Sequence, residues 1–408
     1  MKRSRIVVLG GGMLGVCAAL ELSRRGCSVT LIEGAADVLQ GASRWNEGKI
    51  HLGYLYAADP SLRTATRLIP GGLAFSGLVS RLLGCSVDAF ATEDELFLVH
   101  RHSVVDPATF SAYAARTTEL VLEASSQAQA PAYLADLSVG GFSALSAHEL
   151  GQVTSNDDVV AGFRVPERSV STVAVADLMT QALAAEPRVE VHTHTWIKSV
   201  QRRDDGRFNV ITDAPPPAIA SLEGPFDVVI NALWEGRLAI DAGLGILPPA
   251  PWTHRFRAAV FGRSAATDLR SAVVCTGPFG DIKRYPDGRL YMSWYDAGLL
   301  AQGHDIEPPR SAAVLTEARQ DGVMNGTLTA LSKFFPEVQN LRKHADLEIQ
   351  GGWVYAVGQG SLGDRSSSLH RRDRFDITID RGYISVDTAK YSLAPSLASQ
   401  VADIVTAP

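Results

Sequence analysis

The residues Ile6-Val7-Val8-Leu9-Gly10-Gly11-Gly12-Met13-Leu14-Gly15 decide the fold of this chain. A helix-forming run to Arg25 and a second apolar segment, Val29-Thr30-Leu31-Ile32-Glu33, follow them. This order predicts a strand, a glycine-rich turn, a helix and a second strand that ends in an acid. It is the complete setting of the dinucleotide-binding G-x-G-x-x-G fingerprint. The setting favours dinucleotide binding over a glycine-rich turn in another kind of α/β protein.

Each residue of the fingerprint has a physical role. Gly10 permits the tight turn, Gly12 lets the backbone approach a pyrophosphate, and Gly15 allows the helix to pack closely on the strand. The helix N-terminus offers free N–H groups and the positive end of the helix dipole to phosphates. Glu33 can accept hydrogen bonds from ribose hydroxyls and would repel a 2′-phosphate, which disfavours NADP. The cofactor-binding residues predicted in this segment are Gly10, Gly12, Met13, Leu14, Gly15 and Glu33.

Length and composition narrow the class of protein. At 408 residues the chain can form two domains, and its net charge of −6 gives no electrostatic case for binding nucleic acid or an anionic membrane. The basic start at Lys2, Arg3 and Arg5 is no signal peptide, because the apolar stretch after it is the predicted strand and helix. No run reaches membrane-spanning length. The four scattered cysteines show no metal-ligand spacing, so we expect reduced thiols, no metal site and a cytoplasmic protein.

Helix signals recur along the chain. Asp59-Pro60 predicts a helix through Leu68 that Pro70 ends, and Asp106-Pro107 predicts a second amphipathic helix. The stretch 214–221, rich in Pro, Ala and Ser, is predicted as a loop. Further helices are predicted at about 175–185, 311–335 and 394–405, and strands at 189–191, 208–211, 227–231, within 255–295, at 353–357 and at 383–386.

The pattern predicts an α/β protein with two discontinuous domains. Residues 1–75, 165–235 and 345–408 are predicted to form a Rossmann-like nucleotide domain, because dinucleotide signals and strand-to-helix returns occur at both ends of the chain. Residues 76–164 and 236–344 are predicted to form an α+β, sheet-based substrate domain.

The segment Gly41-Ala42-Ser43-Arg44-Trp45-Asn46-Glu47-Gly48-Lys49-Ile50-His51-Leu52-Gly53-Tyr54 carries a resemblance to a known family. Together with the fingerprint, it resembles the FAD-dependent oxidoreductases of the D-amino-acid oxidase superfamily. It looks most like the branch of L-2-hydroxyglutarate and glycerol-3-phosphate dehydrogenases, which carry a G-x-S…N-x-G-x-I-H-x-G segment. Residues 171–200 are similar to the family's adenine-holding segment. Residues 382–392 resemble its G-K-Y/T-T segment, which precedes a helix pointing at the flavin.

The resemblance implies the fold, an FAD cofactor and the residues that hold it. The further cofactor-binding residues that it implies are Ser43, Arg44, Asn46, Gly48, Ile50, Ile197, Lys390 and Tyr391. Two positions depart from the family pattern. Ala389 replaces the usual glycine before Lys390, and Asn231-Ala232-Leu233-Trp234 must turn without a glycine. FAD is expected to bind without a covalent link, because nothing marks a histidine or cysteine for one.

Three residues are the predicted catalytic group. His51 lies in the segment that the family places near the flavin, although a histidine satisfied by backbone in a tight loop is an equal alternative. Arg284 is the best anchor for a substrate carboxylate, ahead of Arg371 and Arg44, although each of them could be a surface arginine. Tyr291 occupies the position where sarcosine-oxidase-like relatives carry a lysine associated with oxygen reactivity, which favours a dehydrogenase over an oxidase.

Lys390, beside the flavin by resemblance, could equally be a solvent-exposed lysine at a helix start. Further substrate-side candidates are Tyr54, Tyr56, Lys283, Tyr285 and Trp294.

The expected function is oxidation of a CH–OH or CH–NH group on a small substrate that carries a carboxylate, by hydride transfer to flavin N5. Two alternatives stay open. One is a flavin-dependent tailoring enzyme of the monooxygenase kind, and the other is a non-catalytic FAD-binding assembly factor. The pattern leaves the substrate, the electron acceptor and the oligomeric state undetermined.

Overall fold

The computed structural model describes residues 4–127, 131–137, 141–213, 222, 224–247, 251–264 and 269–407. The loop predicted at 214–221 lies outside the described residues. We consider first the sheet that carries the glycine-rich fingerprint, then the larger sheet that faces it.

The fingerprint lies in a sheet of strand order β18-β19-β11-β1-β2-β8. Every neighbouring pair is parallel except β18 and β19. This arrangement confirms the predicted Rossmann-like fold with its α/β sheet. The strand bounds are β1 Ile6–Leu9, β2 Val29–Ile32, β8 Val189–His192, β11 Val228–Asn231, β18 Ile377–Asp380 and β19 Tyr383–Val386.

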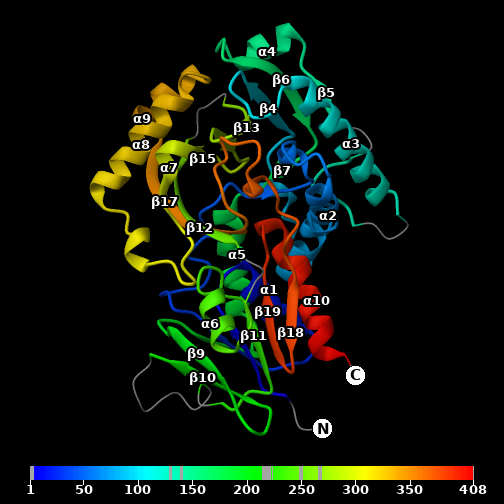
Figure 1. Cartoon of the computed structure of the whole chain (residues 1–408), viewed down its shortest axis with the longest axis vertical. Helices are drawn as coiled ribbons and strands as arrows, with labels where there is room; N and C mark the ends of the chain where they lie inside the picture. The colour runs from blue at the N-terminus through cyan, green and yellow to red at the C-terminus, as the bar shows by residue number, and fades with distance from the viewer. Residues whose placement is uncertain are drawn as a thin grey trace.

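Alternating side chains of β1 bury both faces of this sheet. Ile6 and Val8 pack against a core formed with three helices, α1 Met13–Arg24, α5 Thr172–Ala184 and α10 Ala394–Thr406. Val7 and Leu9 pack toward the hairpin of β9 Ile197–Arg202 and β10 Phe208–Thr212 and toward α6 Arg237–Gly243. Figure 1 shows these layers in the lower half of the molecule. The cofactor fingerprint is therefore held between two packed layers.

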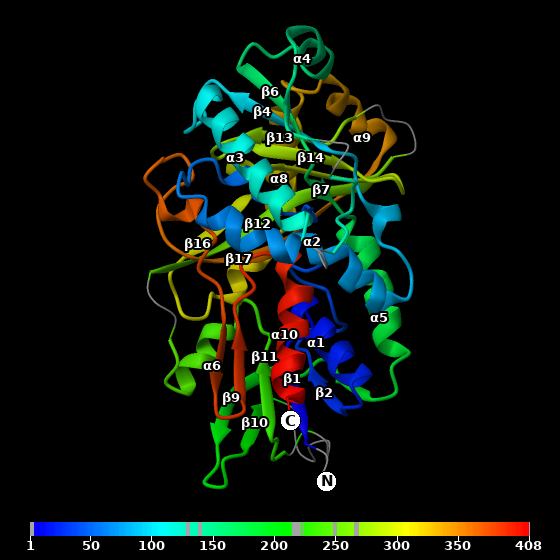
Figure 2. The same cartoon turned by 90° about the vertical axis from the view of Figure 1, so that its right-hand side faces the viewer.

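A second, larger sheet has the order β16-β12-β15-β14-β13-β4-β6-β5, and β17 pairs along β12. One of its faces packs on α8 Glu317–Leu331. It occupies the upper half of the molecule, as Figure 2 shows. The strand bounds are β4 Glu95–His100, β5 Ser143–Ala144, β6 Val159–Val165, β12 Trp252–Arg263, β13 Ala272–Cys275, β14 Gly280–Arg284, β15 Arg289–Trp294, β16 Leu299–Gly303 and β17 Asp346–Val357.

Strand β17 differs from the predicted domain segments. We assigned residues from 345 onward to the nucleotide domain, but β17 pairs with β12 over its whole length and belongs to the larger sheet. An edge strand is placed by the strand it pairs with, which the local pattern does not show. The division into two domains otherwise stays a prediction.

Two helix predictions are corrected and one is confirmed. Helix α2 spans Arg63–Leu83 and continues through Pro70, because its buried face packs against α10 and α3 and outweighs the missing hydrogen bond. It begins after position 60, since the Asp59 carboxylate holds a turn by accepting from Ser61 and Thr64.

Helix α3, Pro107–Ser125, starts as predicted, with Asp106 accepting from Thr109 N at 2.9 Å. The stretch predicted as one helix from 311 splits into a short 3₁₀ turn, Arg310–Ala313, and α8.

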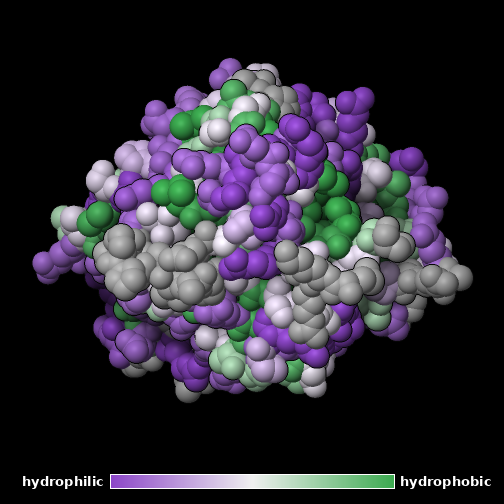
Figure 3. Space-filling model, turned by 90° about the horizontal axis from the view of Figure 1, so that it is seen from below, coloured by the Kyte–Doolittle hydropathy of each residue, from purple (hydrophilic) through white to green (hydrophobic). Residues whose placement is uncertain are grey.

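Short elements complete the fold. The strands β3 Lys49–Ile50 and β7 Arg168–Ser169 pair and fix the segment that resembled the flavin family. The remaining helices are α4 Ala147–Val153, α7 Tyr295–Gly298 and α9 Leu341–His344. The face of the molecule seen in Figure 3 is mainly hydrophilic, with hydrophobic side chains in separate patches. In the described part of the chain, no helix is long and apolar enough to cross a membrane.

Candidate functional site

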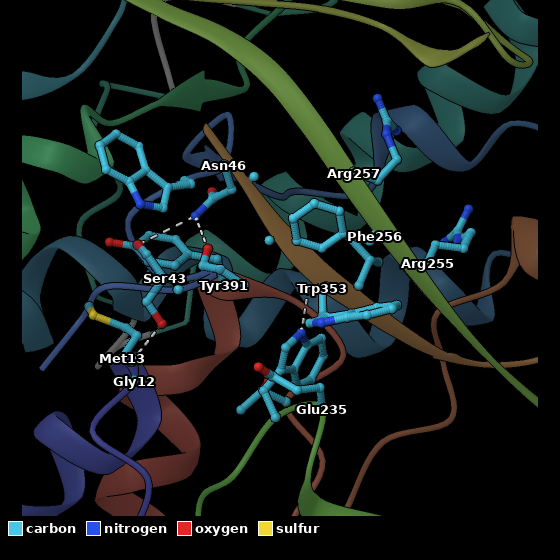
Figure 4. Close-up of a pocket in the computed structure, with 18 of the residues that line it drawn as sticks. Gly12, Met13, Ser43, Asn46, Glu235, Arg255, Phe256, Arg257, Trp353 and Tyr391 are labelled. Carbon is cyan, nitrogen blue, oxygen red and sulfur yellow. Dashed lines mark hydrogen bonds between the residues drawn. The ribbon is translucent and has the colours of Figure 1, made fainter. Parts of the chain in front are cut away.

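A cavity of about 900 Å³ lies between the two sheets. Its lining comes from the turns after β1, β2 and β19 on one side and from β12, β15 and β17 on the other. Figure 4 shows part of this lining. The volume is in the range of small-molecule and cofactor sites. Ligands of open α/β sheets bind at the carboxyl ends of the strands, which is where this cavity begins.

The glycine-rich turn forms the first wall of the cavity. Gly10 has φ 97°, a left-handed conformation that glycine adopts without strain. A Cβ on Gly15 would lie 1.9 Å from the carbonyl oxygen of Gly10, so the helix approaches the turn as closely as predicted. Gly10, Gly12, Met13 and Leu14 line the cavity, whereas Gly15 supports the turn from behind. The N-cap residue Gly12 has no side chain to cap α1, so apart from Met13 N, which donates to Ser43, the first turn is available to an anionic ligand.

Glu33 faces the cavity and also holds the turn. Its carboxylate accepts from Gly11 N and from Ala35 N, both at 2.7 Å. Each carboxylate oxygen keeps a second lone pair that can accept from a ligand hydroxyl. The predicted contact with ribose is therefore compatible with the position of Glu33, which in addition fixes the backbone on both sides of the site.

We expect Glu33→Ala to weaken FAD binding at least about tenfold, since hydrogen bonds to a charged group contribute about 1.5–3 kcal/mol each. The dissociation constant of FAD is measured by titrating the apoprotein and following flavin fluorescence. Glu33→Gln is the matched comparison, because it keeps the shape but can accept through only one oxygen. Equal FAD affinity in Glu33→Ala and the parent would contradict the assignment.

Ser43 and Asn46 shape the next wall. The Ser43 hydroxyl accepts from Met13 N at 2.8 Å and so joins this loop to the start of α1. Asn46 donates to the carbonyl of Ala42 at 2.8 Å and accepts from Gly48 N at 2.7 Å, and the Ala42 bond is drawn in Figure 4. Both residues line the cavity. Their side chains are used largely to hold the loop in place against it.

Three predicted cofactor residues lie behind this loop and do not line the described cavity. Arg44 pairs with Asp177 at 2.7 Å, and the carbonyl of buried Ile50 accepts from the Tyr133 hydroxyl at 2.8 Å. Gly48 has φ 63°, and a Cβ there would lie 1.9 Å from a backbone carbonyl oxygen. We propose that Arg44, Gly48 and Ile50 support the loop.

The nucleotide end of the cavity includes Ile197, as predicted, and a residue that the sequence reasoning missed. Trp196 lies over Gly34, where a Cβ would come within 2.5 Å of the indole ring. The guanidinium of Arg310 stacks on the Trp196 ring at 3.7 Å from its centroid. Ile197, Trp196 and Arg310 all line the cavity. A large aromatic residue within the segment that resembles the family's adenine-holding segment was the available signal.

The turn from β19 into α10 places Lys390 and Tyr391 on the cavity wall. Ala389 adopts φ 49°, so the residue that replaces the usual glycine still takes the left-handed conformation. Its N–H donates to Asp387 at 2.9 Å, and Lys390 N donates to the Thr388 carbonyl. The departure at Ala389 therefore leaves the shape of the turn in place.

Lys390 is half-buried at the cavity and is not a solvent lysine. Burial, followed by the charges of Arg372 and Arg255, lowers the pKa of Lys390 to about 7, whereas Glu47 and Glu167 act in the opposite direction. The ammonium lies 5.7 Å from the centroid of the Tyr56 ring. Its charge near neutral pH thus depends on what else binds in the cavity.

The second departure from the family pattern is compensated by a buried network. The Asn231 amide donates to the Arg237 carbonyl at 3.1 Å, to Asp241 at 2.9 Å and to the Tyr383 hydroxyl at 2.8 Å. Leu233 N donates back to Asn231 at 3.3 Å. The turn that lacks glycine is therefore held by side chains.

His51 is 2% exposed and lines the cavity. Its Nδ1 lies 3.7 Å from a Glu167 oxygen, and neither atom has a hydrogen-bond partner among the described residues. The backbone-satisfied alternative is therefore not what the structure shows at this nitrogen. Burial, then Lys390 and Lys49, hold the pKa of His51 well below its usual range. Burial and these two lysines therefore favour the neutral form of the imidazole.

Glu167 and Glu95 are buried acids that the sequence reasoning missed. Burial raises the pKa of Glu167 to about 7, although its second oxygen accepts from Leu52 N at 2.6 Å. At Glu95 burial is opposed by Lys283 and then Lys49, which hold its pKa at about 2. Lys283 lies 3.0 Å from one Glu95 oxygen, and Lys49 contacts the other. For Glu95 the available signal was an acid at the start of the apolar strand β4, whereas Glu167 lies in the loop between β6 and β7.

The structure brings Tyr291 to the cavity but not Arg284. Tyr291 is buried in a cluster with Phe261 and Tyr285, and burial raises its pKa well above the usual range. Tyr285 reaches toward the site and donates to the Glu47 carbonyl at 2.9 Å. Because side chains alternate along a strand, Arg284 points to the opposite face, so it is not the anchor that we predicted. Arg44 and Arg371, the next candidates for the carboxylate anchor, also do not line the cavity.

Besides Arg310, three arginines that were not predicted line the cavity: Arg255, Arg257 and Arg372. Arg255 and Arg372 are 3% and 7% exposed. None of the three forms an ion pair with a carboxylate within 4 Å in the part of the chain that the structure describes. Burial, followed by the charge of Arg255, lowers the pKa of Arg372 to about 10. Cations placed this way can bind an anionic group of a ligand.

Comparison with known proteins identifies the family. The family model for FAD dependent oxidoreductases, named DAO, matches residues 5–374, so the chain belongs to this family of FAD-binding oxidoreductases. Glycerol-3-phosphate dehydrogenase 1 of Mycobacterium tuberculosis (strain ATCC 25618 / H37Rv) is 39% identical over 62 residues, which are 15% of this chain and only 12% of that protein.

Two solved structures share the fold over nearly the whole chain. Glycine oxidase from Geobacillus kaustophilus has a TM-score of 0.66 at 14% identity and covers 99% of this chain and 95% of its own. L-alpha-glycerophosphate oxidase from Mycoplasma pneumoniae with FAD bound also has a TM-score of 0.66 at 14% identity, covering 100% and 96%. Identities this low show the fold alone.

The residues present fit FAD. The start of α1, whose N-cap residue Gly12 has no side chain, and the glycine cradle suit a pyrophosphate, and Glu33 faces the same cavity. The same cavity is also lined by Lys390 and Tyr391, from the turn before α10. Among the described residues, no group of three or more His, Cys, Asp or Glu side chains is placed to hold a metal ion.

Proposed function

We propose that this oxidoreductase oxidises a CH–OH or CH–NH group that lies next to an acidic group on a small substrate. The observation that carries the proposal is the pair Arg255 and Arg372, two buried guanidiniums without a carboxylate partner beside His51 and Lys390. A buried cation that lacks a counter-charge is costly, so a ligand anion is the natural partner.

The residues divide the work of the reaction. Bound FAD supplies an acceptor at N5 for the two electrons and the hydrogen of the substrate C–H bond. Arg255 and Arg372 bind the acidic group and orient that bond. His51, neutral and facing the cavity, accepts the proton of the hydroxyl or amine as the C=O or C=N bond forms. Tyr291 on the wall supports a dehydrogenase rather than an oxidase.

Anaerobic reduction of the bound flavin tests the proposal. The yellow protein is mixed without oxygen with 2-hydroxy acids, amino acids, amines and sugar derivatives, and absorbance near the flavin maximum is followed. Bleaching by an acid-bearing donor is expected. Bleaching by a pyridine nucleotide alone would instead indicate a monooxygenase, and no bleaching by any donor would indicate a non-catalytic FAD-binding protein.

We further expect all the flavin to be released by acid precipitation. His51 and His370 are the described histidines that line the cavity, and the ring of His51 is held in a buried position beside Tyr56, 5.6 Å between centroids. The two cysteines buried near this core, Cys17 and Cys275, do not line the cavity. Absorbance of the supernatant and pellet measures the result, and yellow colour left in the pellet would show a covalent link.

Lys390 gives a pH prediction. The side chain of Lys390 carries its positive charge below pH 7 and loses this charge as the pH rises through about 7. A bound anion favours the charged form, so the Kd of a carboxylate such as pentanoate should weaken about tenfold from pH 6 to 9, the change that one pKa unit of coupling produces. Flavin absorbance titrations measure the Kd. In Lys390→Gln the dependence should disappear, and its persistence would assign it to Glu167 instead.

A further inference from the structure

Arg255 and Arg257 form a pair on one face of β12. They are two residues apart in the strand, so their side chains leave on the same side, and Figure 4 shows Phe256 leaving on the other. The Cα atoms of such residues are separated by about 6.6 Å. The pair therefore presents two guanidiniums to the cavity at a spacing fixed by the strand.

Tyr295 orients both members of the pair from behind. Its hydroxyl accepts from Arg255 Nη1 at 3.0 Å. Its ring lies under the Arg257 guanidinium, 4.5 Å from centroid to Cζ. The Nε atoms of Arg255 and Arg257 are both buried without a hydrogen-bond partner among the described residues. Each guanidinium group is thus preorganised and keeps an Nε–H that can donate a hydrogen bond to a ligand.

The positive charge here exceeds what one acidic group can neutralise. Arg372 and Lys390 add two cations to the pair, and the charge of Arg255 acts on both of them. The acids whose charges act on these two cations are Glu47 and Glu167 at Lys390 and Asp387 at Arg372. Asp387 lies 3.4 Å from Arg237, which also pairs with Asp241 at 3.0 Å. One substrate carboxylate between Arg255 and Arg372 would leave Arg257 without a counter-charge.

We propose that the substrate is a dianion, with one acidic group bound by Arg255 and Arg372 next to the reacting carbon and a second bound by Arg257. This inference rests on the proposed function and extends it to the substrate class. The strand spacing suits two anionic groups joined by a short aliphatic chain. A dicarboxylate and a phosphorylated carboxylate share this chemistry, because guanidinium forks match both groups.

The test compares non-reacting anions of equal length on the FAD-bound enzyme. Pentanoate carries one carboxylate, glutarate carries two, and 4-phosphonobutanoate carries a carboxylate and a phosphonate. Binding is measured by flavin absorbance and by calorimetry, so that a spectrally silent ligand is not missed. We expect at least one of the dianions to bind at least about tenfold more tightly than pentanoate, which corresponds to about 1.4 kcal/mol. The better of glutarate and the phosphonate identifies the second group.

Arg257→Gln should remove the advantage of the dianion and change the pentanoate Kd less than twofold. Arg263→Gln, on the same strand but exposed, is the matched control and should leave every Kd unchanged. Equal binding of pentanoate and both dianions by the parent would overturn the proposal that the substrate is a dianion, while leaving the proposed function intact. So would equal loss of all three ligands in Arg257→Gln. Failure of every anion to bind would overturn both.

Discussion

Replacing Arg255 by alanine is expected to lower kcat/KM by about 10²- to 10³-fold, a loss of about 2.7–4 kcal/mol of transition-state stabilisation. Arg255 is 3% exposed, donates to the Tyr295 hydroxyl at 3.0 Å and faces Arg372 across the proposed acid-binding position. Its removal deletes a bidentate donor from a buried site where water cannot replace it. Anaerobic stopped-flow reduction of the flavin at limiting substrate measures the change.

Two comparison variants make this result specific. Arg255→Lys keeps the charge but loses the planar fork, so it should recover only part of the rate. In Arg284→Ala the substrate should reduce the flavin at the parental rate, because Arg284 points away from the cavity. FAD content should be the same in all three. A rate equal to the parent in Arg255→Ala, or a comparable loss in Arg284→Ala, would return the anchor to the position that the sequence suggested.

We propose Arg255 as the anchor in place of Arg284, and the difference shows which feature of the site the sequence pattern does not contain. Arg284 stands before the turn Pro286-Asp287-Gly288 among aromatic and basic residues, which made it conspicuous. Its facing is set by pairing with β15, and no local feature reveals which side of that sheet carries a ligand. The pattern Arg255-Phe256-Arg257 inside an apolar strand was an available signal, since two charges on one buried face need a partner. Arg372 gave no such signal, because it lies in a run of arginines typical of a surface.

The parts of the fold that sequence predicted are those fixed by local rules. The fingerprint at residues 6–15, the cap at Asp106 and the C-terminal helix α10 each depend on neighbours a few residues away. The continuation of α2 through Pro70 and the pairing of β17 depend on distant elements. The same holds for the site. Ser43 and Asn46 were identified through the segment that resembles the flavin family, whereas Glu167 reaches His51 from a segment more than a hundred residues away.

Replacing Gly15 by alanine is expected to abolish FAD binding. A Cβ at this position would lie 1.9 Å from the Gly10 carbonyl oxygen and 3.3 Å from a Val8 methyl group. The first contact is with backbone, so no side-chain rotation can relieve it. Helix α1 would have to move away from the turn by more than 1 Å, about the error that separates a productive site from a loose one. That movement displaces the N–H groups that face the pyrophosphate and separates Met13 N from Ser43.

Purification tests this directly, as the ratio of flavin to protein absorbance, together with thermal unfolding. The variant should retain less than about a tenth of the parental FAD, and overpacking against backbone should cost about 1–3 kcal/mol or more of stability. Gly77→Ala is the matched control. Gly77 lies in α2, is exposed and has nothing within 4 Å of an added Cβ. It should keep its FAD and gain about 0.5–1 kcal/mol, because alanine is the better helix former. Full FAD content in Gly15→Ala would mean that the turn and helix separate without cost, and the glycine cradle would then not be what positions the cofactor.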